Sequence, residues 1–288
     1  MVERLAEIEA RIANLDDLQD IMGAMRALAA MRLAQAQGAL PGVRQYAGVI
    51  NLALARGLAL AGTGGGPTGG TDGPMAVVAF TSEHGFAGAY NEHVLERAWT
   101  LARGDRHRLL VVGSRGRIKA EERGCTVAYW QPMATHIDGV LETVLRCSDE
   151  LYGRLARDGI QRVTLVYGRN TAGAQWSVAE EPVLPFDVAS VRQIDEVAPL
   201  IYLDPEALFD RLVEEFVFTR LMLAAVESFA SENAARLTAM EAAHDNIETK
   251  LETLTQQARQ QRQEEITTEL LDVVIGATAA RGSRTSGF

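Results

Sequence analysis

The fold is decided by the stretch FDRLVEEFVFTRLMLAAVESFASENAARLTAMEAAHDNIETKLETLTQQA, residues 209–258. Its mostly apolar seam positions alternate at intervals of three and four, the heptad pattern of a helix that packs lengthwise against another helix. The seam is Phe209, Leu212, Phe216, Thr219, Leu223, Val226, Ala230, Asn233, Leu237, Met240, His244, Ile247, Leu251, Leu254 and Ala258. No proline or glycine occurs between Pro205 and Gly276. We therefore predict one helix over 204–280, on the order of 100 Å long at about 1.5 Å per residue, and a solvated tail over 281–288.

A second seam opens the chain and predicts a helix over residues 1–60, with a kink at Pro41-Gly42. Its members are Leu5, Ile8, Ile12, Leu15, Leu18, Met22, Met25 and Ala29. Two intervals of three in a row place a stammer at Leu18. Matching seams at both ends favour a long antiparallel coiled coil made from the two termini. A helical bundle and a coiled-coil homodimer are the alternatives.

Residues 61–74 are rich in glycine and predict a surface loop. Residues 75–203 then alternate strand and helix signals, which indicates a Rossmann-like α/β domain with a mostly parallel sheet. The expected strands are Met75–Thr81, Arg108–Gly113, Thr126–Trp130 and Arg162–Tyr167, with Gln175–Val183 at an edge. The expected helices are Asn91–Arg103, Arg115–Arg123 and Ile137–Asp158, and Asp204 is expected to cap the long C-terminal helix.

Composition excludes several classes of protein. The formal net charge of −10 argues against a nucleic-acid partner. The N-terminus lacks the apolar core of a signal peptide, and no stretch approaches the roughly 18 apolar residues of a membrane span. The two cysteines, Cys125 and Cys147, have no metal-binding spacing and predict buried free thiols.

Two glycine turns follow the first two strands, Gly85-Phe86-Ala87-Gly88 and Gly113-Ser114-Arg115-Gly116. Such turns can bind phosphate through backbone N–H groups, but neither has the GxGxxG spacing or a Walker lysine. A tight strand-to-helix turn needs glycine for its own sake. The histidines show no metal-ligand spacing, and no nucleophile elbow is present. We therefore expect no catalytic residue, cofactor or metal.

Several motifs in order along the chain resemble the gamma subunit of the F-type ATP synthase. They are Arg11-Ile12, Ala24-Met25, Leu28-Ala29-Ala30, the turn from Thr81 to Asn91, Gly113-Ser114-Arg115-Gly116, the run from Ser231 to Met240, Ala243, Asp245-Asn246, Arg262-Gln263, Ile266-Thr267, Glu269-Leu270 and Gly276-Ala277. The run Asp17-Leu18-Gln19 and the segment from Met25 to Ala30 look more like the alternate, often sodium-linked, bacterial branch. Asp20, Gly23 and Met31 depart from the lysines usual in the family, and Glu83-His84 from its Asp and basic residue.

The resemblance implies a non-catalytic central rotor shaft of a proton- or sodium-transporting ATPase. Its expected partners are the alpha and beta subunits of the catalytic ring, the epsilon subunit and the membrane c-ring, and it should not form a homo-oligomer. It would be peripheral, at the cytoplasmic face of the bacterial inner membrane.

By the same resemblance, Met25, Arg262, Gln263 and Thr267 contact the catalytic ring, the last three from one helix face, and Glu83, His84 and Tyr202 contact the rotor base. Two other functions stay open: a stand-alone coiled-coil scaffold or adaptor, and a nucleotide-binding α/β enzyme with helical extensions. A scaffold would form homodimers through its seams, and an enzyme would bind nucleotide alone.

Overall fold

The computed structural model describes residues 2–61, 73–104, 106–185 and 204–285. The chain divides into two units: Ala27–Ala239, and Met1–Arg26 together with Met240–Phe288. Two long helices run through both units, α1 (Val2–Ala61) and α5 (Pro205–Thr285). The units are described one at a time.

The unit Ala27–Ala239 contains a five-stranded sheet in the order β3-β2-β1-β4-β5. Its strands are β1 (Met75–Phe80), β2 (Arg108–Val112), β3 (Tyr129–Gln131), β4 (Arg162–Ala172) and β5 (Gln175–Leu184). The first four strands pair in parallel, and β5 pairs with β4 antiparallel at the edge. The expected α/β class with a mostly parallel sheet is confirmed.

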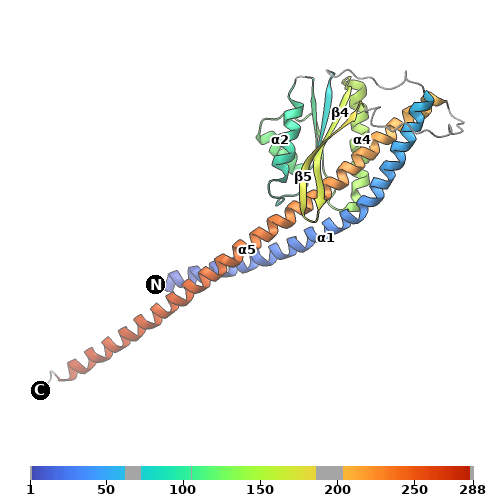
Figure 1. The fold of residues 1–288 in the computed structure, drawn as a ribbon. Helices are drawn as coiled ribbons and strands as arrows, with labels where there is room; N and C mark the ends of the chain where they lie inside the picture. The colour runs from blue at the N-terminus through green and yellow to red at the C-terminus, as the bar shows by residue number, and fades with distance from the viewer. Residues whose placement is uncertain (1, 62–72, 105, 186–203, 286–288) are drawn as a thin grey trace. The chain divides into compact units, whose positions relative to one another are not determined.

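Helices cover both faces of this sheet (Figure 1). They are α2 (Tyr90–Ala102), α3 (Ser114–Glu122), a 3-10 turn η1 (Ile137–Gly139) and α4 (Val140–Arg157). Side chains alternate along β1: Met75, Val77 and Ala79 pack with residues of α2, whereas Val78 and Phe80 pack with residues of α4, α1 and α5. All six residues of β1 are buried, which is why this strand reads as an unbroken apolar run.

In this unit α1 and α5 lie antiparallel. Arg44 of α1 pairs with Glu227 of α5, and farther along α1 Tyr46 donates a hydrogen bond to Glu215. Later residues of α1 therefore meet earlier residues of α5. Asp204 caps α5 as predicted, because its carboxylate accepts the N–H of Ala207 at 3.2 Å.

The helices are also antiparallel within the other unit. Arg262 of α5 donates to Glu9 of α1 at 2.5 Å, while Leu254 lines grooves with both Ile8 and Leu15. Leu5, Ile8, Ile12 and Leu15 are half-buried, and Met22 is buried, as the seam predicts.

The predicted stammer at Leu18 is wrong. Leu18 is exposed and Gln19 is half-buried in its place. The buried face thus keeps the regular alternation of three and four through Leu15, Gln19 and Met22, at the cost of a polar residue in the seam. Helical phase decides which side chain faces the partner helix, even where the neighbouring residue is more apolar.

Helix α1 is continuous through Pro41 to Ala61, close to the predicted end at residue 60. A proline removes one backbone hydrogen bond, and the predicted kink at Pro41-Gly42 stays a prediction. The predicted end of the C-terminal helix differs from the structure. Helix α5 extends past the predicted end at residue 280 to Thr285, since the residues that follow include no proline. Most of the predicted loop 61–74, and residues 186–203 of the predicted domain, lie outside the described residues.

Candidate functional site

The ligand-binding crevice of an open α/β sheet lies at the carboxyl ends of the strands, where the strand order reverses. Here that point lies between β1 and β4, and α5 occupies it. Ser228 of α5 is within 2.6 Å of the hydroxyl of Tyr90, and Glu227 accepts the backbone N–H of Asn170 at 3.1 Å. A Cβ added to Gly168 of β4 would lie 2.6 Å from that of Ser231, so the approach requires glycine. The crevice is therefore filled by the chain's own helix.

The turn between β1 and α2 is held to α5 by Arg236. The guanidinium of Arg236 donates to the carbonyl oxygens of His84 and Gly85 at 3.3 and 3.2 Å. It also pairs with Glu232 at 2.6 Å, with both side chains almost fully buried. Burial raises the pKa of Glu232, and the charge of Arg236 opposes that shift. This part of the turn directs carbonyl oxygens at a cation instead of N–H groups at a phosphate.

The polar groups of the second glycine turn are also bound within the chain, in this case by Glu83. Its carboxylate accepts the backbone N–H of Ser114 at 3.1 Å, the hydroxyl of Ser114 at 2.6 Å and the N–H of Met133 at 2.8 Å. Ser114 is the first residue of α3, so Glu83 occupies the position at a helix N-terminus where an anion would bind. The second glycine turn is therefore no open phosphate site, and the first directs the carbonyl oxygens of His84 and Gly85 at Arg236. Both observations argue against the nucleotide-binding enzyme.

The side chains of the residues expected at the rotor base differ in their exposure to solvent. Glu83 is bound inside the chain, whereas the side chain of His84 is exposed. Two residues farther on, Phe86 is 61% exposed and has a φ of 63°, a conformation that costs a non-glycine residue energy. The turn thus presents His84 and Phe86 at its surface. Tyr202 lies outside the described residues.

The residues expected to contact the catalytic ring do not all lie on one surface. Gln263 and Thr267 line one shallow groove on α5 together with Gln260, Glu264 and Thr268. The expectation that Arg262 shares their helix face is wrong: it bonds to Glu9 of α1 instead. A step of one residue turns a helix by about 100°, which carries Arg262 away from the groove. Met25 is half-buried on α1.

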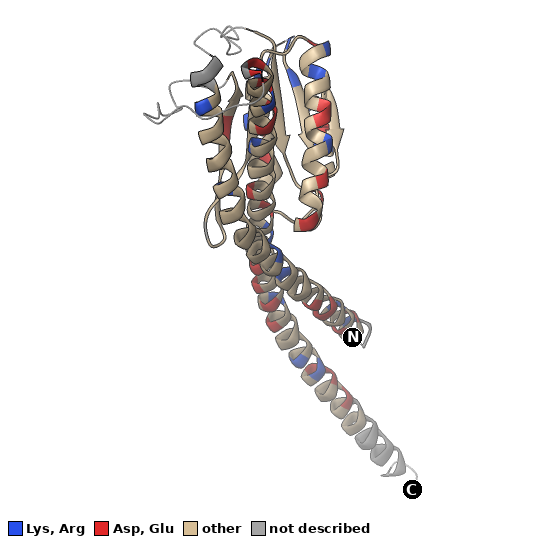
Figure 2. Ribbon diagram, turned by 90° about the vertical axis from the view of Figure 1, so that its right-hand side faces the viewer, with Lys and Arg blue, Asp and Glu red and all other residues tan. Residues whose placement is uncertain are grey.

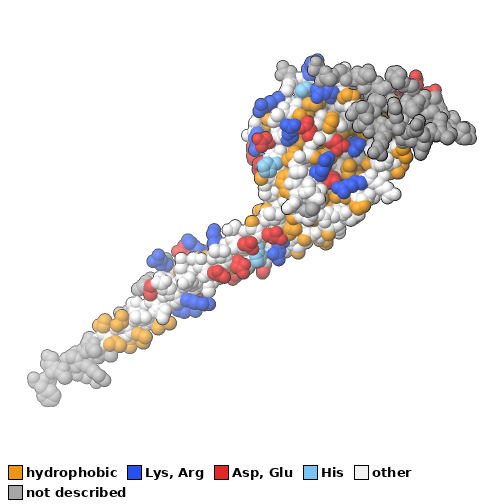
Figure 3. All heavy atoms as spheres, in the orientation of Figure 1, with side chains coloured by type: hydrophobic (Ala, Val, Ile, Leu, Met, Phe, Trp, Pro, Cys, Tyr) orange, Lys and Arg blue, Asp and Glu red, His pale blue; other side chains and the backbone are white. Residues whose placement is uncertain are grey.

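The C-terminal segment of α5 exposes a run of large apolar side chains. These are Ile266, Leu270, Leu271, Val273, Val274 and Ile275, each more than half exposed. Figure 3 shows hydrophobic side chains gathered on α5 beside its grey end. Figure 2 shows charges of both signs distributed along the preceding turns of the helix. An exposed apolar stretch of this length marks a surface that meets another molecule.

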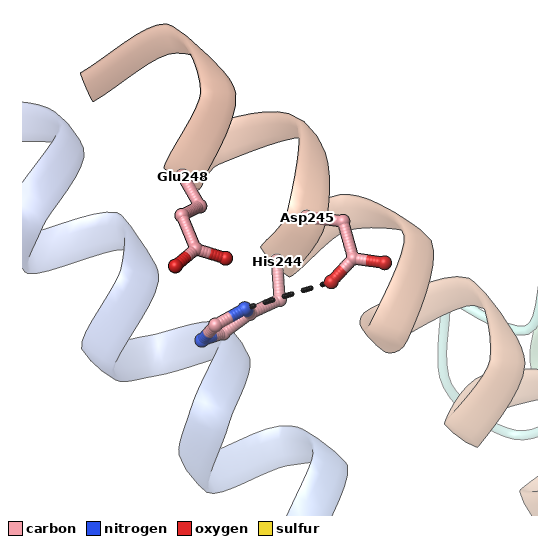
Figure 4. Close-up of side chains that lie close together, drawn as sticks. All are labelled: His244, Asp245 and Glu248. Atoms are coloured by element: carbon pink, nitrogen blue, oxygen red, sulfur yellow. Dashed lines mark ion pairs between the residues drawn. The ribbon is translucent and has the colours of Figure 1, made fainter. Parts of the chain in front are cut away.

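Sequence reasoning missed two clusters on α5. Glu232 and Arg236 enter the sequence analysis only within a family motif and Glu227 is not singled out, although charged residues inside a strongly apolar helical stretch indicate buried pairs. The expectation that no histidine has metal-ligand spacing overlooks His244, which Asp245 and Glu248 accompany. The structure brings their ligand atoms within 4.8 Å of one another (Figure 4). The four-residue interval between His244 and Glu248 was the signal available.

No helix in the described ranges combines the length and the apolar character that a membrane crossing requires.

Known proteins that resemble this chain identify its family. The family model described as ATP synthase matches residues 4–280. The ATP synthase gamma chain of Parafrankia sp. is 30% identical, covering 97% of this chain and 98% of that one. That of Mycolicibacterium smegmatis is 29% identical, covering 99% and 100%.

Solved structures share the fold. A chain of the Euglena gracilis mitochondrial ATP synthase (OSCP/F1/c-ring) gives a TM-score of 0.66 at 16% identity, covering 100% of this chain and 98% of that one. A chain from the central stalk and c-ring of the Tetrahymena thermophila mitochondrial ATP synthase gives 0.60 at 22% identity, covering 77% and 99%. The chain belongs to the ATP synthase family. Within that family it is one of the gamma chains.

Proposed function

We propose that the chain is the central rotor shaft of an F-type ATP synthase or ATPase. It transmits rotation of an ion-driven membrane ring to the catalytic ring and takes no part in the chemistry of ATP itself. The single observation that carries the proposal is that α5 is buried within the chain along one segment and exposed along another. The helix fills the crevice where an α/β domain would bind nucleotide, and farther along it exposes apolar side chains that need a partner outside the chain.

The proposed partners follow from the difference between the buried and the exposed parts of α5. The exposed segment of α5, with Met25 of α1, meets the alpha and beta subunits of the catalytic ring. The α/β domain meets the epsilon subunit and the c-ring, with His84 available at its surface; Tyr202 is proposed as a further contact of the rotor base. Glu83 fits a supporting role, since its carboxylate binds backbone within the domain. The chain has one copy in the complex and forms no homo-oligomer.

The proposed location is peripheral, at the cytoplasmic face of the bacterial inner membrane, where the coupling ion is a proton or sodium. The proposed organisation keeps an N-terminal helix up to about residue 60, the loop 61–74, the α/β domain 75–203 and the C-terminal helix from 204 onward. A stand-alone scaffold is disfavoured because the exposed apolar residues lie on α5 beyond the segment that meets α1 at Glu9.

Groups on the shaft surface supply candidate contacts. Gln263 and Thr267 expose polar atoms beside an apolar stretch, and an amide or hydroxyl there can bond a backbone or carboxylate group of a partner. Arg262 pairs with Glu9, with side chains 64% and 48% exposed. An exposed pair of this kind contributes little to stability, so the guanidinium can exchange Glu9 for a carboxylate of the catalytic ring.

Purification from membranes tests the proposal. An affinity-tagged copy of the chain should recover a complex with ATPase activity and with alpha and beta subunits present. A matched copy lacking residues 265–288 should recover the complex in lower yield or with lower activity. Recovery of the tagged chain as a homodimer, or of ATPase activity in the chain alone, would exclude the rotor role.

A further inference from the structure

A cluster of three metal-ligand side chains lies on one stretch of α5. His244, Asp245 and Glu248 each present a ligand atom, and these atoms lie within 4.8 Å of one another. Figure 4 shows the imidazole and the two carboxylates converging beside the helix, with Glu248 one turn beyond His244. Residues four apart are neighbours on a helix surface, so His244 and Glu248 can reach the same ion.

Packing does not explain why an imidazole stands here. His244 occupies a seam position between the buried Met240 and Ile247, where a coiled coil would ordinarily place an aliphatic residue. Its side chain is 26% exposed, and its ring lies close to the carboxylates of Asp245 and Glu248 (Figure 4). The imidazole is therefore available as a ligand while its position remains fixed by the helix.

The carboxylates are close to the ring without a hydrogen bond between them. Nδ1 of His244 lies 3.9 Å from Oδ1 of Asp245, beyond hydrogen-bond distance. Among the residues that the structure describes, no hydrogen bond to the carboxylate of Asp245 or Glu248 is found. The side chains of Asp245 and Glu248 are exposed, so small rotations can bring both carboxylates onto an ion that the imidazole also binds.

The donor set selects the class of ion. An imidazole nitrogen with carboxylate oxygens suits a borderline divalent transition ion, whereas magnesium and calcium prefer oxygen alone. Zinc bonds to such atoms are about 2.0–2.2 Å long, which places tetrahedral ligands roughly 3.4 Å apart. The observed spacing needs to close only modestly to reach that geometry.

We propose that His244, Asp245 and Glu248 bind one divalent transition ion of the zinc class. Three protein ligands leave a fourth position for water or for a side chain of a partner. The site is separate from the glycine turns and from the groove of Gln263 and Thr267. The inference stands independently of the rotor role.

Metal titration of the 288-residue chain tests the site. After treatment with a chelator, the chain is titrated with Zn²⁺ by calorimetry and with Co²⁺ by its visible absorption. The wild type should bind one ion at this site with an absorption spectrum typical of mixed nitrogen and oxygen ligands. Loss of a ligand should weaken binding by roughly tenfold or more, at least as much as loss of a residue that merely orients one.

Two variants and one control make the result decisive. His244→Leu keeps the seam apolar and removes the nitrogen ligand, and Glu248→Gln removes a charge from an exposed position that does not pack in the seam. Glu252→Gln lies one turn farther along the same helix and should bind as wild type does. Folding of each variant is checked by circular dichroism. If His244→Leu and Glu248→Gln bind Zn²⁺ as tightly as Glu252→Gln, the site does not exist; selective weakening in the first two supports it.

Discussion

Helix α5 behaves differently in the two units. All thirteen residues from Ala224 to Arg236 are buried, and the charged ones among them are paired or hydrogen-bonded within the chain. From residue 266 to residue 275, every side chain that the structure describes is exposed except that of Thr268. One helix thus has a segment whose interactions are internal and a segment whose apolar surface requires another molecule. Mutations in the first should cost folding, and mutations in the second should cost function.

The largest effect is expected for Arg236→Ala. Removing the guanidinium leaves Glu232 buried without its partner and releases the carbonyl groups of His84 and Gly85. Loss of one member of a buried ion pair costs about 3–5 kcal/mol, a large share of the stability of an ordinary domain. Urea unfolding of the chain followed by circular dichroism measures the loss.

The matched control is Arg262→Ala, just before the exposed segment, where the ion pair with Glu9 is open to solvent. This substitution should lower the free energy of unfolding by about 0–1 kcal/mol. Equal losses for the two arginines would contradict the contrast between the segments.

The second prediction concerns the end of α5. A chain ending at Glu264 should unfold at nearly the same urea concentration as wild type, because residues 266–275 bury little surface within the chain. The ATPase rate of the complex that contains it should fall by roughly tenfold or more, the factor that 1.4 kcal/mol of lost transition-state stabilisation produces. A chain ending at Gly276 keeps the exposed apolar run and should retain most of the rate. Equal ATPase rates for the two truncated chains would show that the exposed apolar residues have no role in ATPase activity.

Much of the fold, but not the contrast between the two segments of α5, could be predicted from the sequence. The heptad seams predict two long helices because their period follows from helix geometry, and the unbroken apolar run of β1 predicts a buried parallel strand. The internal character of residues 224–236 could not be predicted, since the bonds from Arg236 to the turn at His84 join residues about 150 positions apart. The error at Leu18 has a different origin: Leu18 is the more apolar residue, but helical phase places its neighbour Gln19 in the seam. The hydrogen bond from Arg262 to Glu9 depends on where the partner helix α1 lies.

The third prediction separates the residues of the contact surface. The double substitution Arg262→Ala with Gln263→Ala should lower the ATPase rate by roughly twofold to fivefold while the complex still purifies whole, since about 0.4–1 kcal/mol accounts for such a factor. Glu9→Ala removes only the internal partner of Arg262 and should leave the rate near wild type. If Glu9→Ala slows the complex as much as the double variant, Arg262 acts through the helix pair and not through the catalytic ring.

The smallest effect is expected for the cysteines. Burial raises the pKa of Cys147 to about 12 and that of Cys125 above its ordinary value. The reactive thiolate is therefore scarce at neutral pH in the folded chain. Ellman's reagent should label neither thiol quickly until denaturant is added, and the labelling rate should rise only as the pH approaches the raised pKa values. The double variant Cys125→Ala with Cys147→Ala should retain its ATPase rate in the assembled complex, and a large loss would give the thiols a role that their burial does not predict.

Observation of rotation in single complexes tests the central claim most directly. In the background of Cys125→Ala and Cys147→Ala, a cysteine introduced at the exposed Glu122 of α3 attaches a bead to the α/β domain, and the catalytic ring is fixed to glass. On addition of ATP the bead should turn in one direction, at a rate that follows ATP hydrolysis. A bead that stays still while the same complexes hydrolyse ATP at full rate would contradict the assignment of this chain as the rotor shaft.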